Sequence, residues 1–191
     1  MMPDPARSRE QVRQKIVQSA ALLFNRHGFS AVSIDDIMAG AGLTRGGFYS
    51  YFQSKSELYA EAISRFVNEK QEGIAALEKA PERAVKILRD YLSRAHLEDL
   101  DTSSPLLGLP NDLSGSDQSV RVAQESALRM LIDTFELGVQ PSAQPARQRA
   151  LALASLCVGG VVLARAIEDR SLASELREAT MAIALKLGEW T

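Results

Sequence analysis

The most informative stretch of this chain is residues 16–59, IVQSAALLFNRHGFSAVSIDDIMAGAGLTRGGFYSYFQSKSELY. Apolar side chains recur three and four positions apart, which is typical of the buried face of an α-helix. Gly28 ends the first helical stretch and suits a left-handed C-terminal cap, and Gly42 separates the two short stretches that follow. Two short helices joined by a tight turn containing Gly42 predict a helix-turn-helix.

Capping residues predict where these helices begin. Ser33-x-x-Asp36 is a capping box, so we expect the second helix to start at Ser33. Thr44 is expected to cap a third, short helix, and Ser54-x-x-Glu57 to open a longer fourth one.

The helix expected over residues 44–52 is the candidate DNA-reading element. In a helix-turn-helix the second helix lies in the major groove, with its first residues facing base edges. Phe48 and Phe52 lie four apart and face inward. The outward surface then carries Arg45, Gly46, Tyr49 and Ser50. Tyr49 is a candidate phosphate donor, Lys55 adds another, and the missing side chain of glycine lets the backbone approach DNA closely.

The rest of the chain also shows helical periodicity and no strand-like alternation, so an all-α fold is expected. Helices are predicted over about 81–97, 120–139, 146–168 and 172–189. Residues 99–117 are rich in Ser, Pro, Gly and Asp and predict a long loop or a broken helix. The length of 191 residues and the 46% of apolar residues suffice for a sizeable core. We expect a helix-turn-helix domain over residues 1–55 and a second helical domain over 56–191.

The charge of the chain is unevenly placed. The net charge of −2 excludes a globally basic DNA-binding protein. Residues 1–55 nevertheless hold seven basic and four acidic side chains, so this part carries +3 and the remaining 136 residues carry −5. This asymmetry favours a polyanion-facing head on an acidic body, with chance as the alternative. Arg7, Arg9 and Arg13 either extend the contact with DNA or are simply solvated.

Several protein classes are disfavoured by composition. The single cysteine, Cys157, cannot close a disulfide within the chain, and two histidines provide few ligands for a structural zinc. No apolar stretch follows the N-terminus, so no secretory signal is expected. The longest uncharged apolar run, residues 150–164, has 15 residues, fewer than the roughly 20 of a membrane helix. We therefore expect a cytoplasmic protein without a membrane span, metal or cofactor.

Together these residues resemble the DNA-binding domain of the TetR/AcrR family of bacterial transcription regulators. The resemblance covers about the first 60 residues without a gap and rests on the elements LF-x-x-x-G, S-I-x-D-I, A-G-x-T, G-x-x-Y and F-x-x-K-x-x-L-Y. It implies an all-helical homodimer whose N-terminal helices bind a palindromic operator. It also implies a larger C-terminal domain that binds a small molecule, which releases the DNA.

The resemblance extends to individual DNA contacts. It assigns them to Ser33, Thr44, Arg45, Gly46, Tyr49, Ser50, Tyr51 and Lys55. Ser33 matches the phosphate-contacting residue of the second helix, and the residues from Thr44 to Gly46 match the base- and backbone-facing start of the recognition helix. Tyr49 matches the phosphate-bonding tyrosine, and Lys55 the lysine that anchors the next helix. Many members have an aromatic residue and then His at the positions of Ser50 and Tyr51, so this chain departs from the pattern there.

The C-terminal domain offers three candidate ligand contacts, Phe66, Tyr91 and His96. Phe66 and Tyr91 either line a cavity or fill the core. His96 is either a polar group in a pocket, or a histidine that is hydrogen-bonded within the protein or exposed to solvent. Ser104 stands where some family members have a cysteine before proline, and it has no thiol chemistry. Cys157 lies in an apolar run, where a buried thiol is expected and a redox sensor is the alternative.

Small residues in the last two helices indicate how two subunits meet. They are Ala150, Ala152, Ala154, Ser155, Gly159, Gly160 and Ala164. Close approach at these positions would let the two terminal helices pair with their symmetry mates in a four-helix bundle. The alternative is that this face packs within one chain.

The sequence predicts a DNA-binding regulator, most simply a repressor, and not an enzyme. It has no phosphate-binding glycine loop, no H-E-x-x-H and no nucleophile in a known motif. The acidic pairs Asp35-Asp36 and Glu168-Asp169 are adjacent, so they point apart and indicate caps or solvated faces. An activator, a regulator that needs a co-repressor, and a helical enzyme or small-molecule carrier remain as alternatives.

Overall fold

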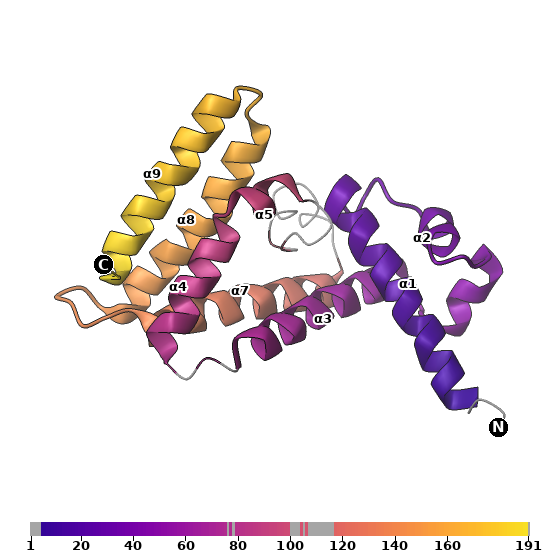
Figure 1. Cartoon of the computed structure of the whole chain (residues 1–191). Helices are drawn as coiled ribbons and strands as arrows, with labels where there is room; N and C mark the ends of the chain where they lie inside the picture. Colours follow the sequence, from indigo (N-terminus) through magenta and orange to yellow (C-terminus); the bar gives the residue numbers. More distant parts are fainter. Residues whose placement is uncertain are drawn as a thin grey trace.

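The computed structural model describes residues 5–75, 77, 79–99, 104, 106 and 117–190, and every regular element among them is helical. This confirms the all-α prediction. The elements are α1 (Pro5–His27), α2 (Ile34–Gly40), the 3-10 helix η1 (Arg45–Ser50), α3 (Lys55–Ala75), α4 (Ala80–Tyr91), α5 (Arg94–Glu98), α7 (Gln118–Gly138), α8 (Ala146–Ala166) and α9 (Arg170–Gly188). Figure 1 shows α1 and α2 at one end of the molecule and α8 and α9 at the other.

The N-terminal helices begin and end where the local signals place them. Gly28 follows α1 with φ of 79°, and Gly42 follows α2 with φ of 72°, both in the left-handed region that favours glycine. The Ser33 capping box is formed, because the Ser33 hydroxyl accepts from the Asp36 N–H at 3.1 Å and the Ser33 N–H donates to the Asp36 carboxylate at 3.0 Å. The Ser54 hydroxyl accepts from the Glu57 N–H at 3.1 Å as α3 begins.

The predicted cap at Thr44 is wrong. The Thr44 side chain makes no capping hydrogen bond, and the element that follows is a 3-10 helix rather than an α-helix. Its tighter turns appear in the bond from the Gly47 N–H to the Thr44 carbonyl at 3.1 Å. Gly46 and Gly47 supply the physical reason, since each glycine costs about 1 kcal/mol relative to alanine within an α-helix.

The apolar stripes read from the sequence form the core of the N-terminal head. Ile16, Ile37, Phe48 and Phe52 are fully or almost fully buried, and the rings of Phe48 and Phe52 lie 5.9 Å apart. The head therefore folds around the inward faces of α1, α2 and η1, and their outward faces are left for other contacts.

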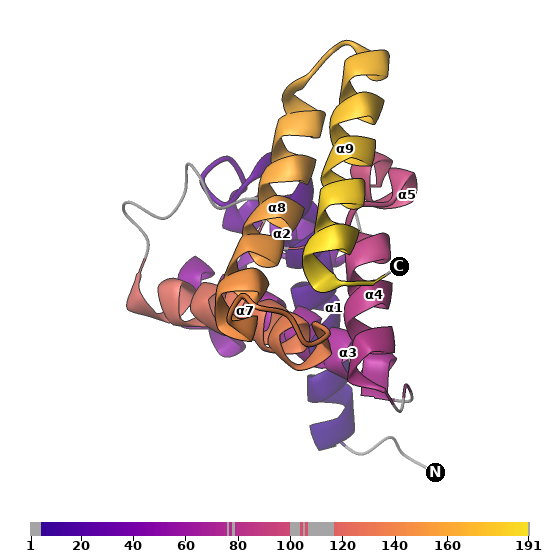
Figure 2. The same ribbon diagram turned by 90° about the vertical axis from the view of Figure 1, so that its left-hand side faces the viewer.

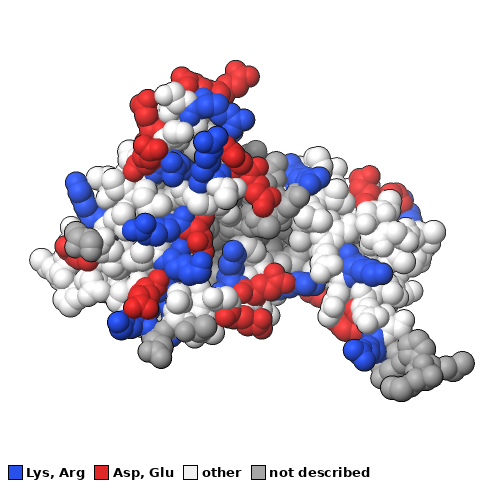
Figure 3. All heavy atoms as spheres, in the orientation of Figure 1, with Lys and Arg blue, Asp and Glu red and all other residues white. Residues whose placement is uncertain are grey.

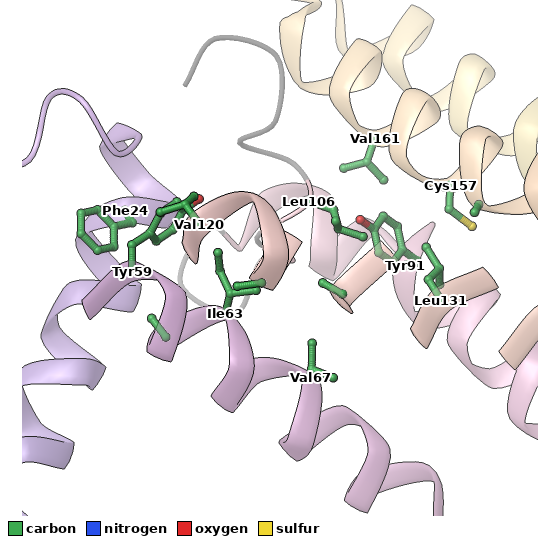
Figure 4. Packing of buried hydrophobic residues seen from close by; sticks show 14 of the residues in the cluster. Phe24, Tyr59, Ile63, Val67, Tyr91, Leu106, Val120, Leu131, Cys157 and Val161 are labelled. Atoms are coloured by element: carbon green, nitrogen blue, oxygen red, sulfur yellow. The ribbon is translucent and has the colours of Figure 1, made fainter. Parts of the chain in front are cut away.

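Helix α3 connects the head to the rest of the molecule. Figure 1 shows it running from beside α1 into the body, where it lies along α7. Figure 4 follows the buried residues from Phe24 and Tyr59 at the head, along Ile63 on α3, toward Tyr91 in the body. Head and body thus share one continuous hydrophobic core.

The single helix predicted over about 81–97 is two helices in the structure. Helix α4 ends at Tyr91, and Ser93 starts α5 by accepting from the His96 N–H at 3.0 Å while donating to the Asp90 carbonyl at 2.8 Å. A serine that bonds to nearby backbone groups competes with the continuing helix, which explains the break. Most of the predicted loop over 99–117 lies outside the described residues.

The predicted C-terminal helices are confirmed as α8 and α9, which lie side by side and project beyond α4 and α7 (Figure 2). A side chain at Gly160 would meet the Thr180 methyl group at 2.9 Å, so this glycine allows the two helices to approach closely. Asp169 caps α9 by accepting from the Ser171 N–H at 2.8 Å. Trp190 packs beside the end of α7, where its indole N–H donates to the Gly138 carbonyl at 2.8 Å.

The small residues of α8 divide between two environments. Ala150, Ala154, Gly160 and Ala164 are buried within the chain. The alternative of packing within one chain therefore accounts for these four, and the prediction that they meet a second subunit is wrong. Ala152, Ser155 and Gly159 are not buried within the chain.

Helix α8 is longer than the apolar run suggested. Its 21 residues, with a mean hydropathy of 1.6, are long and apolar enough to cross a membrane by length and composition alone. Both flanking arginines are held by backbone carbonyls of the body, because Arg149 donates to Gln140 and Leu187, and Arg165 donates to His96. Such a helix, packed on α7 and α9, has the environment of a core helix in a helical bundle.

Candidate nucleic-acid interface and ligand cavity

The outward side of η1 is an exposed polar surface. Tyr49 is 65% exposed, and Thr44, Arg45, Gly46 and Ser50 are also exposed. The Tyr49 ring packs edge-on against buried Phe48, with the ring centroids 5.3 Å apart. This contact supports the Tyr49 ring at the surface, where its hydroxyl is available to a ligand.

Arg45 is positioned by a contact that the sequence did not reveal. Its guanidinium donates to the Asp35 carboxylate at 2.7 Å, and both side chains are exposed. Asp35 lies in the first turn of α2, so the pair joins the two helices of the helix-turn-helix. An exposed ion pair contributes only about 0–1 kcal/mol, so a stronger partner can displace Asp35.

Ser33 lies at the same end of α2 as Asp35. Its hydroxyl donates to the Asp36 carboxylate at 2.6 Å as part of the capping box. This hydrogen bond, with that from the Ser33 backbone, lowers the pKa of Asp36 below its ordinary value. The structure therefore gives Ser33 a capping role, and a phosphate contact there would add to it.

The Lys55 side chain makes hydrogen bonds within the head and does not project into solvent. Its ammonium group donates to the carbonyls of Phe29 at 2.8 Å and Val32 at 2.9 Å, and lies 4.3 Å from the centre of the Phe29 ring. These bonds tie the connection between α1 and α2 to the start of α3. A phosphate contact by Lys55 would use the same group that holds this connection.

The arginines of α1 support the turn between η1 and α3. Arg9 donates to the Ser50 carbonyl at 2.7 Å, and its guanidinium carbon lies 5.8 Å from the centre of the Tyr51 ring. Arg13 donates to the Tyr51 carbonyl at 2.5 Å and forms an ion pair with Glu61 of α3. Half-buried Tyr51 therefore takes part in packing between α1 and this turn.

The body does not present one sign of charge on the face drawn in Figure 3. Lys and Arg side chains are intermixed there with Asp and Glu side chains over α4, α8 and α9. A mixed surface gives no long-range preference for a polyanion. On this face the body therefore offers no uniformly basic surface to a nucleic acid.

A cavity of about 240 Å³ lies in the body between α3, α4 and α7. Phe66, Tyr91 and His96, the three candidate ligand residues, all line it. They come from α3, α4 and α5, and no pattern in the sequence indicates that these helices meet. Sequence reasoning missed the remaining apolar wall, which includes Ile87, Leu106, Met130 and Leu131.

Two buried polar atoms of this cavity lack a partner. Among the described residues, neither the Tyr91 hydroxyl nor His96 Nε2 makes a hydrogen bond of good geometry, although the Ser104 side chain, which also lines the cavity, lies close enough to Tyr91 to affect its pKa. The two rings lie 5.0 Å apart, and Figure 4 shows Tyr91 between Leu106 and Leu131. Burial, with a smaller effect of the Arg165 charge, lowers the pKa of His96 to about 4, so its ring is neutral at pH 7. Burial raises the pKa of Tyr91, which also stays neutral.

We expect Tyr91→Phe to stabilise the protein by about 1 kcal/mol and to raise Tm by about 2–4 °C, because it removes a buried, unpaired hydroxyl. Tyr59→Phe is the matched control. The Tyr59 hydroxyl accepts from the Gln124 amide at 3.3 Å in a buried site, so its removal lowers Tm. Thermal unfolding followed by circular dichroism measures both, and a lower Tm for Tyr91→Phe would contradict the unpaired state of this hydroxyl.

Cys157 has the environment of an inert thiol. It is fully buried, and burial raises its pKa to about 12. A thiol that is protonated and shielded from solvent reacts slowly with oxidants and electrophiles, which favours the buried-thiol interpretation over a redox sensor. Within the described ranges, no group of three His, Cys, Asp or Glu side chains is placed to hold a metal ion.

Comparisons with known proteins agree with this arrangement. A sequence profile of bacterial regulatory proteins of the tetR family matches residues 16–62. The HTH-type transcriptional repressor DhaR of Mycobacterium sp. (strain GP1) is 32% identical over 136 residues, which cover 70% of this chain and 65% of DhaR. The chain thus spans slightly less than two thirds of the length of this relative.

Solved structures share the fold across almost the whole chain. NemR of E. coli in its reduced form has a TM-score of 0.78 at 18% identity, covering 93% of this chain and 97% of NemR. A TetR-family transcriptional regulator of Agrobacterium tumefaciens has a TM-score of 0.75 at 19% identity, covering 91% and 97%. These structures show the fold, and the profile match over residues 16–62 together with the similarity to DhaR identifies this chain as a member of the TetR family of bacterial regulatory proteins.

Proposed function

We propose that this chain is a transcriptional repressor whose head binds double-stranded DNA and whose body binds a small molecule that weakens this binding. The observation that carries the proposal is the exposed surface of η1 within a helix-turn-helix, where Tyr49 and Arg45 project beside the first turn of α2. The naming of the relative DhaR as a transcriptional repressor supports the direction of control.

The head provides a small set of proposed DNA contacts. Arg45 is suited to reading a guanine, and the Tyr49 hydroxyl to donating to a phosphate. Gly46, with no side chain and open space around it, lets the backbone approach DNA. Thr44, Ser50 and Ser33 are also exposed, and the contacts of Tyr51 and Lys55 would be made through groups that also hold the head together.

The proposed active form is a homodimer paired through the outward faces of α8 and α9. Exposed leucine and isoleucine side chains are placed along these faces: Leu151, Leu163, Leu172 and Ile183. An apolar surface of this kind is typical of a protein–protein interface. A two-fold dimer would place two heads on half-sites about 34–36 Å apart, which makes a palindromic operator the natural target.

Helix α3 is the proposed connection between the ligand cavity and the head. Its first half contributes Tyr59 to the head junction, and its second half contributes Phe66 to the cavity wall. A ligand changes DNA affinity only if it binds the two arrangements of the heads with different affinity. The same geometry would serve an activator or a regulator that needs a co-repressor.

We also propose a cytoplasmic location, no enzymatic activity, and a domain boundary near residue 55. These proposals are supported by the regulator family of the chain and by the start of α3 at Lys55. No membrane, metal or cofactor takes part in the proposed function.

Selection of random duplex DNA on the purified chain tests the proposal. We expect an enriched palindrome whose affinity falls as salt rises, because phosphate contacts release counterions. Enrichment without two-fold symmetry would contradict the dimeric arrangement. No enrichment from folded protein would contradict the proposed DNA-binding function.

The dimer has its own test. We expect light scattering at micromolar concentration to give twice the chain mass of 20.8 kDa, and Leu163→Glu with Ile183→Glu to restore the mass of one chain. These side chains are 56% and 53% exposed, so charge there disrupts an interface without disturbing the core. Leu137→Glu, at a 72% exposed leucine on α7, is the matched control and should stay dimeric. A monomeric wild-type protein would contradict the proposal.

A further inference from the structure

The cavity between α3, α4 and α7 combines an apolar wall with one small polar corner. The wall consists of Phe66, Ile87, Leu106, Met130 and Leu131. The corner consists of the Tyr91 hydroxyl and His96 Nε2. Tyr91 is 8% exposed, so its hydroxyl is inaccessible to bulk water.

The polar corner is incomplete without a ligand. Buried polar atoms in proteins are almost always hydrogen-bonded, and among the residues that the structure describes these two make no hydrogen bond of good geometry, with only the buried Ser104 side chain near Tyr91. The ring centroids of Tyr91 and His96 are 5.0 Å apart, so the two side chains line the same part of the cavity. A few convergent polar groups in an otherwise apolar cavity are typical of a site that orients a small molecule.

The charges around the cavity favour an uncharged occupant. Two cations and two carboxylates line its exposed rim: Glu69, Lys70, Lys86 and Asp90. Lys86 pairs with Asp90 at 2.8 Å, and Glu69 accepts from Arg65 at 2.7 Å. These pairs engage three of the four rim charges and leave Lys70 at the outer edge, while the groups at the polar corner are neutral. An ionised ligand group would lose its hydration without gaining an unpaired opposite charge at this corner.

The size of the cavity limits the occupant. An apolar cavity of about 150 Å³ holds one benzene molecule, so about 240 Å³ suits roughly ten non-hydrogen atoms. Phe66 and Met130 in the wall provide favourable contacts for an aromatic ring.

We propose that this cavity binds a neutral, mainly apolar aromatic molecule of about ten non-hydrogen atoms that carries one hydroxyl or carbonyl oxygen. The oxygen hydrogen-bonds to Tyr91 and His96, and the ring packs against the apolar wall. This inference rests on the proposed function, because it takes the cavity as the site of the molecule that controls DNA binding.

Three probes of nearly the same shape test the chemistry: acetophenone, ethylbenzene and benzoate. Each is titrated into the full chain up to about 1 mM, without DNA, and Kd is measured by ligand-observed NMR. We expect acetophenone to bind about tenfold more tightly than ethylbenzene, which lacks the oxygen, and than benzoate, which is charged. Tyr91→Phe should raise the Kd of acetophenone about fivefold and change the Kd of ethylbenzene by less than about twofold. Tyr51→Phe, outside the cavity, should change neither Kd.

Each other outcome overturns the inference. Equal affinity for acetophenone and ethylbenzene would mean that the polar corner is not used, and tightest binding of benzoate would identify an anion site at the Lys70 rim. Absence of binding by all three probes would exclude this class of ligand. The DNA experiment is independent of the probe titration. If the chain binds the probe but selects no DNA, the proposed repressor function is overturned and the ligand class assigned to the cavity stands. If the chain selects an operator but binds no probe, the repressor function stands and the ligand class is overturned.

Discussion

Replacing Arg45 with alanine is expected to lower affinity for the selected operator about 5- to 150-fold, which corresponds to about 1–3 kcal/mol. The physical reason is the loss of a bidentate hydrogen bond from the guanidinium to a guanine. Arg45 is exposed at the start of η1, and its only ion-pair partner among the described residues is the equally exposed Asp35. Its removal should therefore cost little folding stability, so a loss of DNA binding reports on recognition.

Fluorescence anisotropy with the operator and with a scrambled duplex of the same composition measures the effect. A base contact predicts that Arg45→Ala weakens operator binding far more than scrambled binding and relaxes selection at one base pair per half-site. Equal losses on both duplexes would reassign Arg45 to a phosphate contact. An unchanged operator affinity would remove Arg45 from the interface.

Asp35→Asn is the matched variant for this measurement. In the free protein the Asp35 carboxylate competes for the Arg45 guanidinium at 2.7 Å, and near DNA it would face phosphate groups. Neutralising Asp35 should raise the affinity for both duplexes, since repulsion from the polyanion is lost. It should also lower the ratio of operator affinity to scrambled-duplex affinity, because Arg45 is no longer held in place. An increase in that ratio would show that Asp35 does not position Arg45.

The second large effect is expected at Phe48, which is fully buried between the helices of the head. Phe48→Ala should destabilise the head by about 3–5 kcal/mol, through lost burial and the cavity that it leaves. Its neighbour Tyr49 is 65% exposed, so Tyr49→Ala should change stability by only about 0.5 kcal/mol. Adjacent residues on one short helix thus separate folding from binding.

Urea unfolding and operator titration, carried out on both variants, test this separation. Phe48→Ala should lower the unfolding midpoint and weaken DNA binding as a consequence. Tyr49→Ala should keep the midpoint and still weaken binding, because a phosphate contact is lost. A Tyr49→Ala protein with full operator affinity would exclude the phosphate role, and one with a strongly lowered midpoint would show that its contact with Phe48 is structural.

Local signals in the sequence were sufficient for the head. The capping box at Ser33, the left-handed glycines Gly28 and Gly42, and the pair Phe48 and Phe52 each depend on residues within about four positions. Whether such a cap, left-handed glycine or helical pair forms depends on local backbone geometry, which can be inferred from neighbouring residues in the sequence. The Thr44 cap failed because two glycines weakened the α-helix that it was expected to start, and the tighter 3-10 turn does not use the Thr44 side chain.

The helical periodicity and the capping residues were enough to predict an all-helical chain, a helix-turn-helix near its start and the apolar face of each helix. The packing of the helices was needed to find that Phe66, Tyr91 and His96, from three helices, line one cavity, and that Asp35 lies beside Arg45. It also decided which small residues of α8 pack against α9. The physical reason is that periodicity and caps depend on neighbours within one helix. The contents of a cavity depend on how helices far apart in sequence pack against one another.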